Sequence, residues 1–345
     1  MPREYHRQFV FDSFNSVDKR YSEFQPIGRG AYGAVCKAKD TSTRQYVAVK
    51  RINISNASAF KLKRTYREIK IISSVQHKNL IKMTDLFTGD TSLADFKNIF
   101  VARPNGDHRL ISYLGYQILC GLNHLHKHGI IHRDLKPSNI GAISTGCVIK
   151  LLDFGLSRQL IDKNDDQTLY VVTRFYRAPE VVIEMAYDNK IDLWSVGCIL
   201  AELATKTVLF RGENATDQWQ KICDKMGTPD PLFYSGASDA QPVRTRIPME
   251  RIIPSTIFNP ETESKPKLCT SSFYSFLSKL LSFHPESRYD ARQALDDPYV
   301  NSWYKKDEVD CPVIEREIST LEVGERTSDS YWREQLFNAV RMLDN

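Results

Sequence analysis

The stretch that decides the fold is His132-Arg-Asp134-Leu-Lys136-Pro-Ser-Asn139. It places three groups of complementary chemistry in one short segment. Asp134 could accept a proton from a substrate hydroxyl or orient it, and Lys136 could offset negative charge on a phosphoryl group in transfer. Asn139 adds an amide oxygen that could hold a metal ion. The segment therefore predicts phosphoryl-transfer chemistry, with a surface loop of no catalytic role as the alternative.

A second motif, Asp153-Phe-Gly155, comes fourteen residues after Asn139 and directly follows a predicted strand that ends at Leu152. A carboxylate in this place is a hard oxygen ligand, which suits Mg²⁺ bridging the phosphates of a nucleotide. The alternative is an ordinary turn. If the positions were independent, the ordered set of motifs would arise by chance well below about one time in a million, so the alternative fails.

The run Gly28-Arg-Gly30-Ala-Tyr-Gly33-Ala-Val35 has the pattern GxGxxGxV. Three glycines let a backbone turn pass close over phosphates because no Cβ stands in the way. A dinucleotide-binding site would need a helix directly after the glycines, whereas here a further strand follows. The pattern therefore predicts a hairpin that covers phosphates, with a plain glycine turn as the alternative.

Lys50 ends the otherwise apolar run Val47-Ala-Val-Lys50. One interpretation is an edge lysine that extends to water. The other is a buried ammonium that grips phosphates and is itself held by a carboxylate. Glu68 is the expected partner, because it borders the apolar face of a predicted helix over Ser58–Val75.

The order of predicted elements favours an α+β fold with a cleft between two lobes, because strands dominate the first part of the chain and helices the rest. Leu62, Ile69, Ile72 and Val75 form the apolar stripe of the first helix. The expected elements are strands at Tyr21–Ile27, Ala34–Ala38, Tyr46–Ile52, Thr84–Phe87, Asn98–Val101, Ile130–Ile131 and Cys147–Leu152, with helices at Ser58–Val75, Ile111–Leu125 and Tyr331–Leu343.

Composition excludes several classes of protein. The 345 residues carry 47 Lys and Arg against 42 Asp and Glu, and this small excess is spread along the chain rather than gathered in the stripe expected of a nucleic-acid reader. The charged start lacks the apolar run of a secretory signal, and Val196–Ala204 is too short to span a bilayer. Seven scattered cysteines without CxxC spacing argue against a disulfide framework or zinc cluster and favour a reducing compartment.

Taken together, these motifs resemble those of a eukaryotic protein kinase, from about Phe9 to the end of the chain. The segment Thr168-Leu-Tyr170, followed by Val171–Glu180, is similar to the dual-phosphorylation lip of a mitogen-activated protein kinase. Ser112–His126 and the runs Asp217-Gln-Trp219 and Gly227-Thr-Pro229 are most similar to the c-Jun N-terminal kinase branch, with the neighbouring stress-activated branch as the near alternative.

The resemblance implies a bilobal eukaryotic protein kinase fold, with a small β-rich amino-terminal lobe and a larger, mainly α-helical carboxyl-terminal lobe. Residues 1–20 are expected to form an extension on the small lobe, 21–105 the small lobe, 106–304 the large lobe and 305–345 an extension that packs back on the small lobe. Within the large lobe we expect Glu180 of Ala-Pro-Glu to need a buried cation, for which Arg288 is the candidate. Asp192 is expected to anchor the backbone of the catalytic loop.

The activity implied is proline-directed phosphorylation of Ser or Thr with ATP and Mg²⁺. The expected partners are protein substrates with Ser/Thr-Pro sites, an upstream dual-specificity kinase, and phosphatases or scaffolds with basic docking motifs, with no direct nucleic-acid or membrane partner. A cytoplasmic location is implied, and a nuclear one stays open. The catalytic residues implied are Lys50, Glu68, Asp134 and Lys136, and the metal ligands are Asn139 and Asp153. The nucleotide-binding residues implied are Ile27, Gly28, Gly30, Gly33, Val35, Ala48, Lys50, Arg103, Asn105, Asn139 and Asp153.

Regulation is expected at Thr168 and Tyr170. Two phosphates there would add a charge of roughly −3 to −4, which paired arginines could bind and so order the lip. The receptors implied are Arg67, Arg133 and Arg158 for the phosphothreonine, and Arg174 and Arg177 for the phosphotyrosine. Asp307, Glu308 and Asp310 resemble the acidic docking patch of the family, with a solvated acidic turn as the alternative.

Two departures from the family pattern affect these expectations. Leu169 stands between the two phosphosites, where relatives most often carry Pro, Gly or Glu. Only ten residues separate Val101 from Ser112, about half of what the family uses. Aligning this stretch with the hinge puts Arg103 C=O and Asn105 N–H at the adenine. A catalytically weak or inactive scaffold on a kinase fold is therefore the alternative function, and a shortened gene model or splice form would explain the gap equally well.

Overall fold

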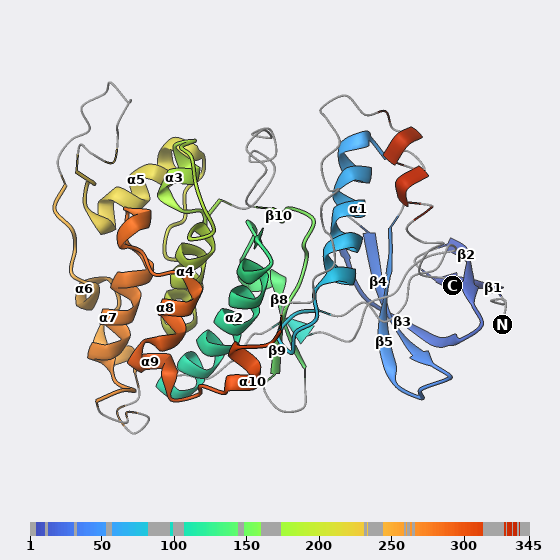
Figure 1. Cartoon of the computed structure of the whole chain (residues 1–345), viewed down its shortest axis with the longest axis horizontal. Helices are drawn as coiled ribbons and strands as arrows, with labels where there is room; N and C mark the ends of the chain where they lie inside the picture. The colour runs from blue at the N-terminus through green and yellow to red at the C-terminus, as the bar shows by residue number, and fades with distance from the viewer. Residues whose placement is uncertain are drawn as a thin grey trace.

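The structure is a computed structural model of the 345-residue chain. It describes residues 5–10, 13–30, 33–52, 57–81, 97–98, 107–143, 148–159, 174–230, 233, 244–258, 260, 263, 266–312, 328, 330–332, 334–336 and 338. A β-rich part and a helical part lie side by side (Figure 1), as the order of elements predicts.

The small lobe begins with a hairpin of β1 (Tyr5–Val10) and β2 (Ser13–Asp18), followed by an antiparallel sheet. The sheet has the order β3 (Tyr21–Gly30), β4 (Gly33–Asp40), β5 (Tyr46–Arg51). The predicted hairpin at the glycines is present, and its strands continue into the glycine pattern itself, where Gly30 pairs with Gly33. The β1–β2 hairpin was not predicted, because its residues carry no clear alternation of apolar and polar side chains.

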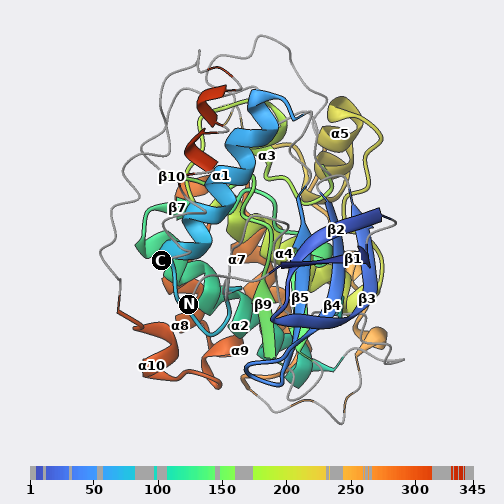
Figure 2. The ribbon, with the colours of Figure 1, turned by 90° about the vertical axis from the view of Figure 1, so that its right-hand side faces the viewer.

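One helix of this lobe, α1 (Ala59–Ser74), matches the expected span to within one residue at each end. The predicted stripe is correct, since Leu62, Ile69, Ile72 and Val75 are all buried. Figure 2 shows α1 beside the sheet, with the helical turns near the carboxyl terminus next to it. In those turns the Trp332 ring lies 5.7 Å from the ring of Tyr66 on α1, centroid to centroid.

The large lobe contains helices α2 to α10 and, among the described residues, two small β-structures. Its strands are β6 (Lys97–Asn98), β8 (Ile140–Ile143) and β9 (Val148–Leu151) in one sheet, and β7 (Ile130–Ile131) paired with β10 (Arg158–Gln159). Its helices are α2 (His108–Lys127), α3 (Pro179–Val182), α4 (Ile191–Thr205), α5 (Ala215–Met226), α6 (Met249–Ile252), α7 (Thr270–Leu280), α8 (Ala291–Asp296), α9 (Pro298–Asn301) and α10 (Lys306–Val309), with 3-10 turns η1 (Pro137–Asn139), η4 (Ser255–Ile257) and η6 (Pro285–Ser287).

Two long helices, α2 and α4, form the centre of this lobe. Asp107 caps α2 by accepting hydrogen bonds from the backbone of Arg109 and Leu110, which satisfies two of its first N–H groups. Helix α4 is mostly apolar because it lies within the core, and Trp194 on it is fully buried. This rigid pair positions the catalytic loop, which follows α2 directly.

The segment that follows α1 pairs with β9 of the large lobe. The backbone N–H of Leu151 on β9 donates to the carbonyl of Asn79 at 2.8 Å, and the N–H of Ile81 donates to the carbonyl of Leu151 at 3.1 Å. The predicted strand Thr84–Phe87 lies outside the described residues, as does all of Asn98–Val101 except Asn98 in β6. The lobe boundaries at residues 20, 105 and 304 stay predictions. Within the described ranges, no helix has the length and apolarity needed to cross a bilayer.

Candidate active site

Lys50 and Glu68 form an ion pair between β5 and α1, with 2.6 Å between Lys50 Nζ and Glu68 Oε1. The side chains are 19% and 12% exposed, so the pair is largely shielded from solvent. Burial alone would lower the pKa of Lys50, but the negative charges of Glu68 and Asp153 outweigh it and raise that pKa. The ammonium therefore stays charged, as a phosphate-gripping group requires.

The catalytic loop brings Asp134, Lys136 and Asn139 together. Lys136 Nζ lies 2.8 Å from Asp134 Oδ2, and Asn139 Nδ2 donates to the same oxygen at 2.9 Å. Asn139 Nδ2 also donates to the carbonyl of Asp134 at 2.7 Å, so the amide oxygen of Asn139 is left as the group that could bind a metal ion. Burial raises the pKa of Asp134, and the positive charge of Lys136 offsets part of this effect.

Asp192 on α4 anchors the backbone of this loop, as the sequence predicts. Its carboxylate accepts the backbone N–H of His132 at 2.8 Å and that of Arg133 at 2.9 Å. Arg133 has φ +67°, a left-handed backbone that a non-glycine residue rarely adopts, so the support stabilises a strained turn. His126 Nε2 donates to the same carboxylate at 2.9 Å. Sequence reasoning missed His126; its signal is a histidine in the last turn of the helix that leads into the loop.

Asp153 connects the two halves of the site. Its charge raises the pKa of Lys50 in the small lobe and also that of Asp134 in the large lobe, so its carboxylate lies near both groups. Its own backbone is left-handed, with φ +61°, and its Oδ1 accepts the N–H of Gly155 at 3.2 Å. A Cβ at Gly155 would lie 3.1 Å from that oxygen, a tight contact that a larger residue could make only if the Asp153 side chain shifted. Phe154, fully buried, packs on the ring of His132 at 5.3 Å.

The donor set fits Mg²⁺ in part. Asp153 and Asn139 offer a carboxylate and an amide oxygen, both hard ligands. Among the residues that the structure describes, no group of three or more His, Cys, Asp or Glu side chains could hold a metal ion. Mg²⁺ commonly takes one or two protein oxygens and completes its shell with water and substrate phosphates, so two ligands are sufficient.

The predicted nucleotide-contact residues are described unevenly. Val35 pairs with Lys50 in the sheet, and Ala48 on the same strand is buried. For Ile27, Gly28, Gly30 and Gly33 the structure gives the strand backbone. Arg103 and Asn105 lie outside the described residues.

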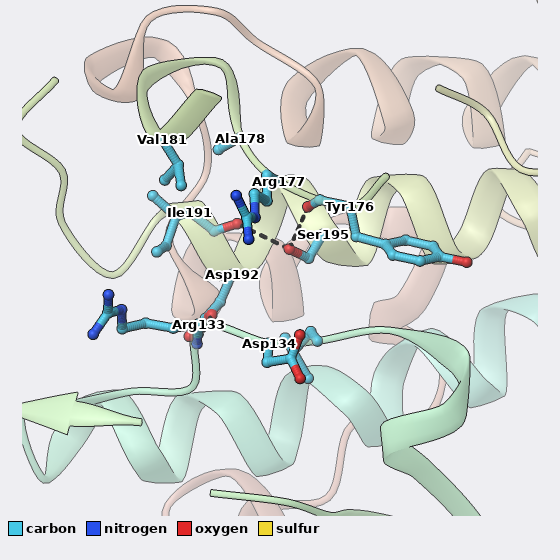
Figure 3. A pocket seen from close by; sticks show the side chains of 10 residues that line it. Arg133, Asp134, Tyr176, Arg177, Ala178, Val181, Ile191, Asp192 and Ser195 are labelled. Carbon is cyan, nitrogen blue, oxygen red and sulfur yellow. Dashed lines mark hydrogen bonds between the residues drawn. The ribbon is translucent and has the colours of Figure 1, made fainter. Parts of the chain in front are cut away.

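Three of the five predicted phosphate receptors lie close together. Burial lowers the pKa of Arg177, and the positive charges of Arg174 and Arg133 lower it further, while Asp134 acts in the opposite sense. The guanidinium of Arg174 donates to the carbonyl of Glu213. Arg133, Asp134 and Arg177 line one pocket between the catalytic loop, α3 and α4 (Figure 3). The other two receptors, Arg67 on α1 and Arg158 on β10, are buried; Thr168, Leu169 and Tyr170 lie outside the described residues.

The predicted docking residues face different surroundings. Asp307 is exposed. Glu308 points inward and pairs with Lys78 at 2.6 Å, while Asp310 contacts Arg292 at 3.0 Å. Two of the three carboxylates therefore already hold cations of the same chain.

The predicted structural pair of Glu180 and Arg288 is present. Arg288 donates to both carboxylate oxygens of Glu180, at 2.6 and 2.9 Å, and both side chains are almost completely buried. This bidentate pair fixes the end of the lip segment to the large lobe.

Comparison with known proteins agrees with this geometry. Residues 21–300 match the family model described as a protein kinase domain, and the chain belongs to the protein kinase family. It is 40% identical to the Caenorhabditis elegans protein named GLH-binding kinase 1, over 96% of this chain and 90% of that protein. It is 38% identical to the stress-activated protein kinase JNK of Drosophila melanogaster, over 96% of this chain and 93% of that protein. With the JNK of the sponge Suberites domuncula the identity is also 38%, over 99% of each.

Within the family, the chain is a JNK-like stress-activated mitogen-activated protein kinase, a serine/threonine kinase. A protein kinase domain implies the use of ATP, and a kinase of this type implies protein substrates and upstream kinases. The three alignments, of 357, 350 and 361 positions, are all longer than the 345-residue chain. The relatives therefore carry residues that have no counterpart in this chain.

Proposed function

We propose that this kinase transfers the γ-phosphoryl group of ATP, bound with Mg²⁺, to Ser or Thr residues followed by Pro. We further propose that phosphorylation of Thr168 and Tyr170 switches it on. The proposal extends the serine/threonine kinase class to a substrate motif, a metal and a mode of regulation.

The observation that carries the catalytic part is the position of Asp153. Its charge acts on both Lys50 and Asp134, which belong to different lobes. A triphosphate held by Lys50 would therefore have its terminal phosphate near the acid that meets the substrate hydroxyl. Positioning and electrostatic stabilisation do most of the work in phosphoryl transfer, so this arrangement supports catalysis.

Each side chain then has a distinct role. Lys50, held by Glu68, binds the phosphates. Asp134 orients the substrate hydroxyl and accepts its proton, while Lys136 neutralises charge on the transferred group. Mg²⁺, held by Asn139 and Asp153, would neutralise charge on the phosphate oxygens.

The raised pKa of Asp134 gives this role a pH dependence. The protonated carboxyl cannot accept the hydroxyl proton, so activity should fall as the pH falls through the pKa of Asp134. Because burial raises this pKa above the ordinary 3.8, the loss should begin at a higher pH than for an exposed aspartate. The acid limb of the kcat/KM profile measures it.

The regulatory part is supported by the arginine group near Asp134. Arg133, Arg174 and Arg177 gather positive charge beside the catalytic acid, and burial limits how far water screens it. A phosphate at Tyr170 could neutralise Arg174 and Arg177, and one at Thr168 could engage Arg133 with the buried Arg67 and Arg158. Because Arg67 and Glu68 are neighbours on α1, such contacts would also fix the partner of Lys50.

The experiment is a phosphorylation assay on a Ser-Pro peptide and a matched Ser-Ala peptide, with lip-phosphorylated protein and its Asp134→Asn variant. We expect turnover of about 1–100 s⁻¹ on the Ser-Pro peptide, little on the other, and loss of transfer in Asp134→Asn with ATP binding retained. Equal rates for Asp134→Asn and wild type would refute the mechanism. Absence of both turnover and a melting shift with Mg-ATP would instead favour the scaffold alternative.

Partners and location belong to the same proposal. Proteins with basic docking motifs would meet Asp307 and Asp310 first, since these are the exposed members of the acidic segment, and Asp310 already contacts Arg292. A cytoplasmic location is proposed from the resemblance to stress-activated kinases.

A further inference from the structure

The guanidinium of Arg133 lies over the ring of Tyr187, with 5.6 Å between its central carbon and the ring centroid. Tyr187 belongs to the loop between α3 and α4 and packs, half-buried, against the main core. A cation over an aromatic face is attracted by the negative charge above the ring, and the attraction grows as water is excluded. None of the roles derived so far uses Tyr187.

The loop that carries Tyr187 is held on both sides. Before it, the N–H of Met185 donates to the carbonyl of Glu180 at 2.8 Å, and Glu180 is fixed by its ion pair with Arg288. After it, Asp188 Oδ1 accepts the N–H of Lys190 at 2.8 Å. The ring therefore belongs to a rigid part of the large lobe rather than to a free surface loop.

Arg133 is fixed at its backbone, where its N–H donates to Asp192 and its φ is left-handed. Its long side chain still has several rotatable bonds, so backbone support alone does not place the charge. The face of Tyr187 gives the guanidinium a defined position at a smaller cost in side-chain entropy when an anion binds.

Placement matters here because three like charges are close together. Arg133 and Arg174 both act on Arg177, so each of them repels the guanidinium of Arg177 in the absence of an anion. Arg174 is tied to the carbonyl of Glu213. Tyr187 does the same for Arg133, so two of the three charges have a fixed support from the large lobe.

We propose that Tyr187 is a positioning residue that holds Arg133 in place, so that Arg133 is preorganised to bind the phosphate of Thr168 together with Arg67 and Arg158. This inference rests on the proposed phosphate switch, but it concerns the affinity of these arginines for the anion, which can be measured apart from the switch.

The test compares Tyr187→Leu, which keeps apolar bulk but removes the aromatic face, with Tyr187→Phe as the matched control that keeps it. The first measurement is the ratio of the rates of lip-phosphorylated and unphosphorylated kinase on a Ser-Pro peptide. We expect Tyr187→Leu to reduce this ratio about 5- to 10-fold, and Tyr187→Phe to leave it near that of wild type. An equal loss of both rates in Tyr187→Leu would show a merely structural role and overturn the inference.

The second measurement uses inorganic phosphate as the probe and follows the melting temperature of the unphosphorylated chain. Stabilisation by phosphate should need about 5-fold more anion in Tyr187→Leu than in wild type. A double-mutant cycle with Arg133→Met should show no further effect of Tyr187→Leu once the guanidinium is gone. If Tyr187→Leu fails to fold, Tyr187→Met takes its place in both measurements.

The outcomes separate the two proposals. Wild-type behaviour of Tyr187→Leu in both measurements overturns the inference. If wild type is not activated by lip phosphorylation, the switch is wrong, and the phosphate-binding comparison still decides the role of Tyr187. A lower phosphate affinity in Tyr187→Leu that disappears in the Arg133→Met background supports the inference in either case.

Discussion

Two ion pairs of this kinase that are shielded from solvent, Lys50–Glu68 and Glu180–Arg288, use similar charges for different purposes. Glu180 and Arg288 are 1% and 0% exposed, whereas Glu68 and Lys50 are 12% and 19% exposed. Arg288 also donates to the carbonyls of Ser282, Phe283 and Lys190, and its guanidinium lies over Trp194 at 5.3 Å.

The difference shows how a structural pair and a catalytic pair can be told apart. Arg288 is saturated by hydrogen bonds inside one lobe, so no incoming group can use it. Lys50 lies between a strand and a helix of the small lobe, keeps some exposure, and responds to Asp153 from the other lobe. A pair whose ammonium must also bind phosphates needs this remaining exposure.

The largest expected effect on stability comes from breaking the saturated pair. Arg288→Met leaves Glu180 as an uncompensated buried charge, which should lower the free energy of unfolding by about 3–5 kcal/mol. Chemical denaturation measures this loss. The double variant Glu180→Leu with Arg288→Met should recover part of it, and a single variant as stable as wild type would contradict the structural role.

Lys50→Met should have the opposite effect, a large loss of activity with only a small loss of stability. We expect loss of roughly 10²- to 10³-fold in kcat, because a charge that stabilises the transferred phosphates is removed. The free energy of unfolding should fall by only about 2 kcal/mol, the scale of one hydrogen bond to a charged group. Activity assays and denaturation of the same preparation test both parts, and a stability loss as large as that of Arg288→Met would remove the distinction between the pairs.

Glu68→Gln should have a smaller effect on kcat, about tenfold, since an amide can still accept a hydrogen bond from Lys50 but a neutral acceptor binds an ammonium about half as strongly. The pair also has a pH dependence. The pKa of folded Lys50 is raised above the ordinary 10.5, so its stabilisation is complete below 10.5 and is lost as the pH rises through the raised value.

In Glu68→Gln this alkaline loss of stability should begin at lower pH, because the main charge that raises the pKa of Lys50 is gone. Melting temperatures measured between neutral pH and pH 11 follow it. An unchanged alkaline profile would show that the pair does not govern the protonation of Lys50.

The smallest effect is expected at Lys78–Glu308, where Lys78 is 36% exposed. Lys78→Gln should cost at most about 1 kcal/mol at neutral pH. Burial alone would raise the pKa of Glu308, but its bond with Lys78 lowers it below the ordinary 4.5. This stabilisation is present above pH 4.5 and is lost as the pH falls through the lowered pKa. The free energies of unfolding of Lys78→Gln and wild type should therefore converge in urea titrations at acid pH.

The catalytic core could be predicted from sequence because its residues stand in local motifs with fixed spacing. Asp134, Lys136 and Asn139 share one loop, and the pairings of Lys50 with Glu68 and Glu180 with Arg288 follow from recognising the motifs that carry them. The helix α1 was predicted to within one residue at each end, whereas α2 begins three residues before the predicted Ile111 and ends two after the predicted Leu125.

What was missed depends on contacts between distant segments. His126 and Tyr187 gain their roles from Asp192 and Arg133, and neither partner can be read from the periodicity around them. The inward turn of Glu308 toward Lys78, 230 positions earlier, is likewise invisible in an acidic run that reads as solvated. The short strand β8 (Ile140–Ile143) was not predicted either, because it has only four residues and contains Gly141.

The ion pairs of Glu308 on α10 and of Asp310 directly after it have a consequence for any basic docking peptide. Such a peptide would have to displace Lys78 from Glu308 and Arg292 from Asp310, so its arrival exchanges one set of ion pairs for another. Because the peptide forms about as many ion pairs as it breaks, its affinity should vary little with ionic strength. Lys78 lies just beyond the end of α1, so displacing it would act on the carboxyl-terminal end of the helix that carries Glu68.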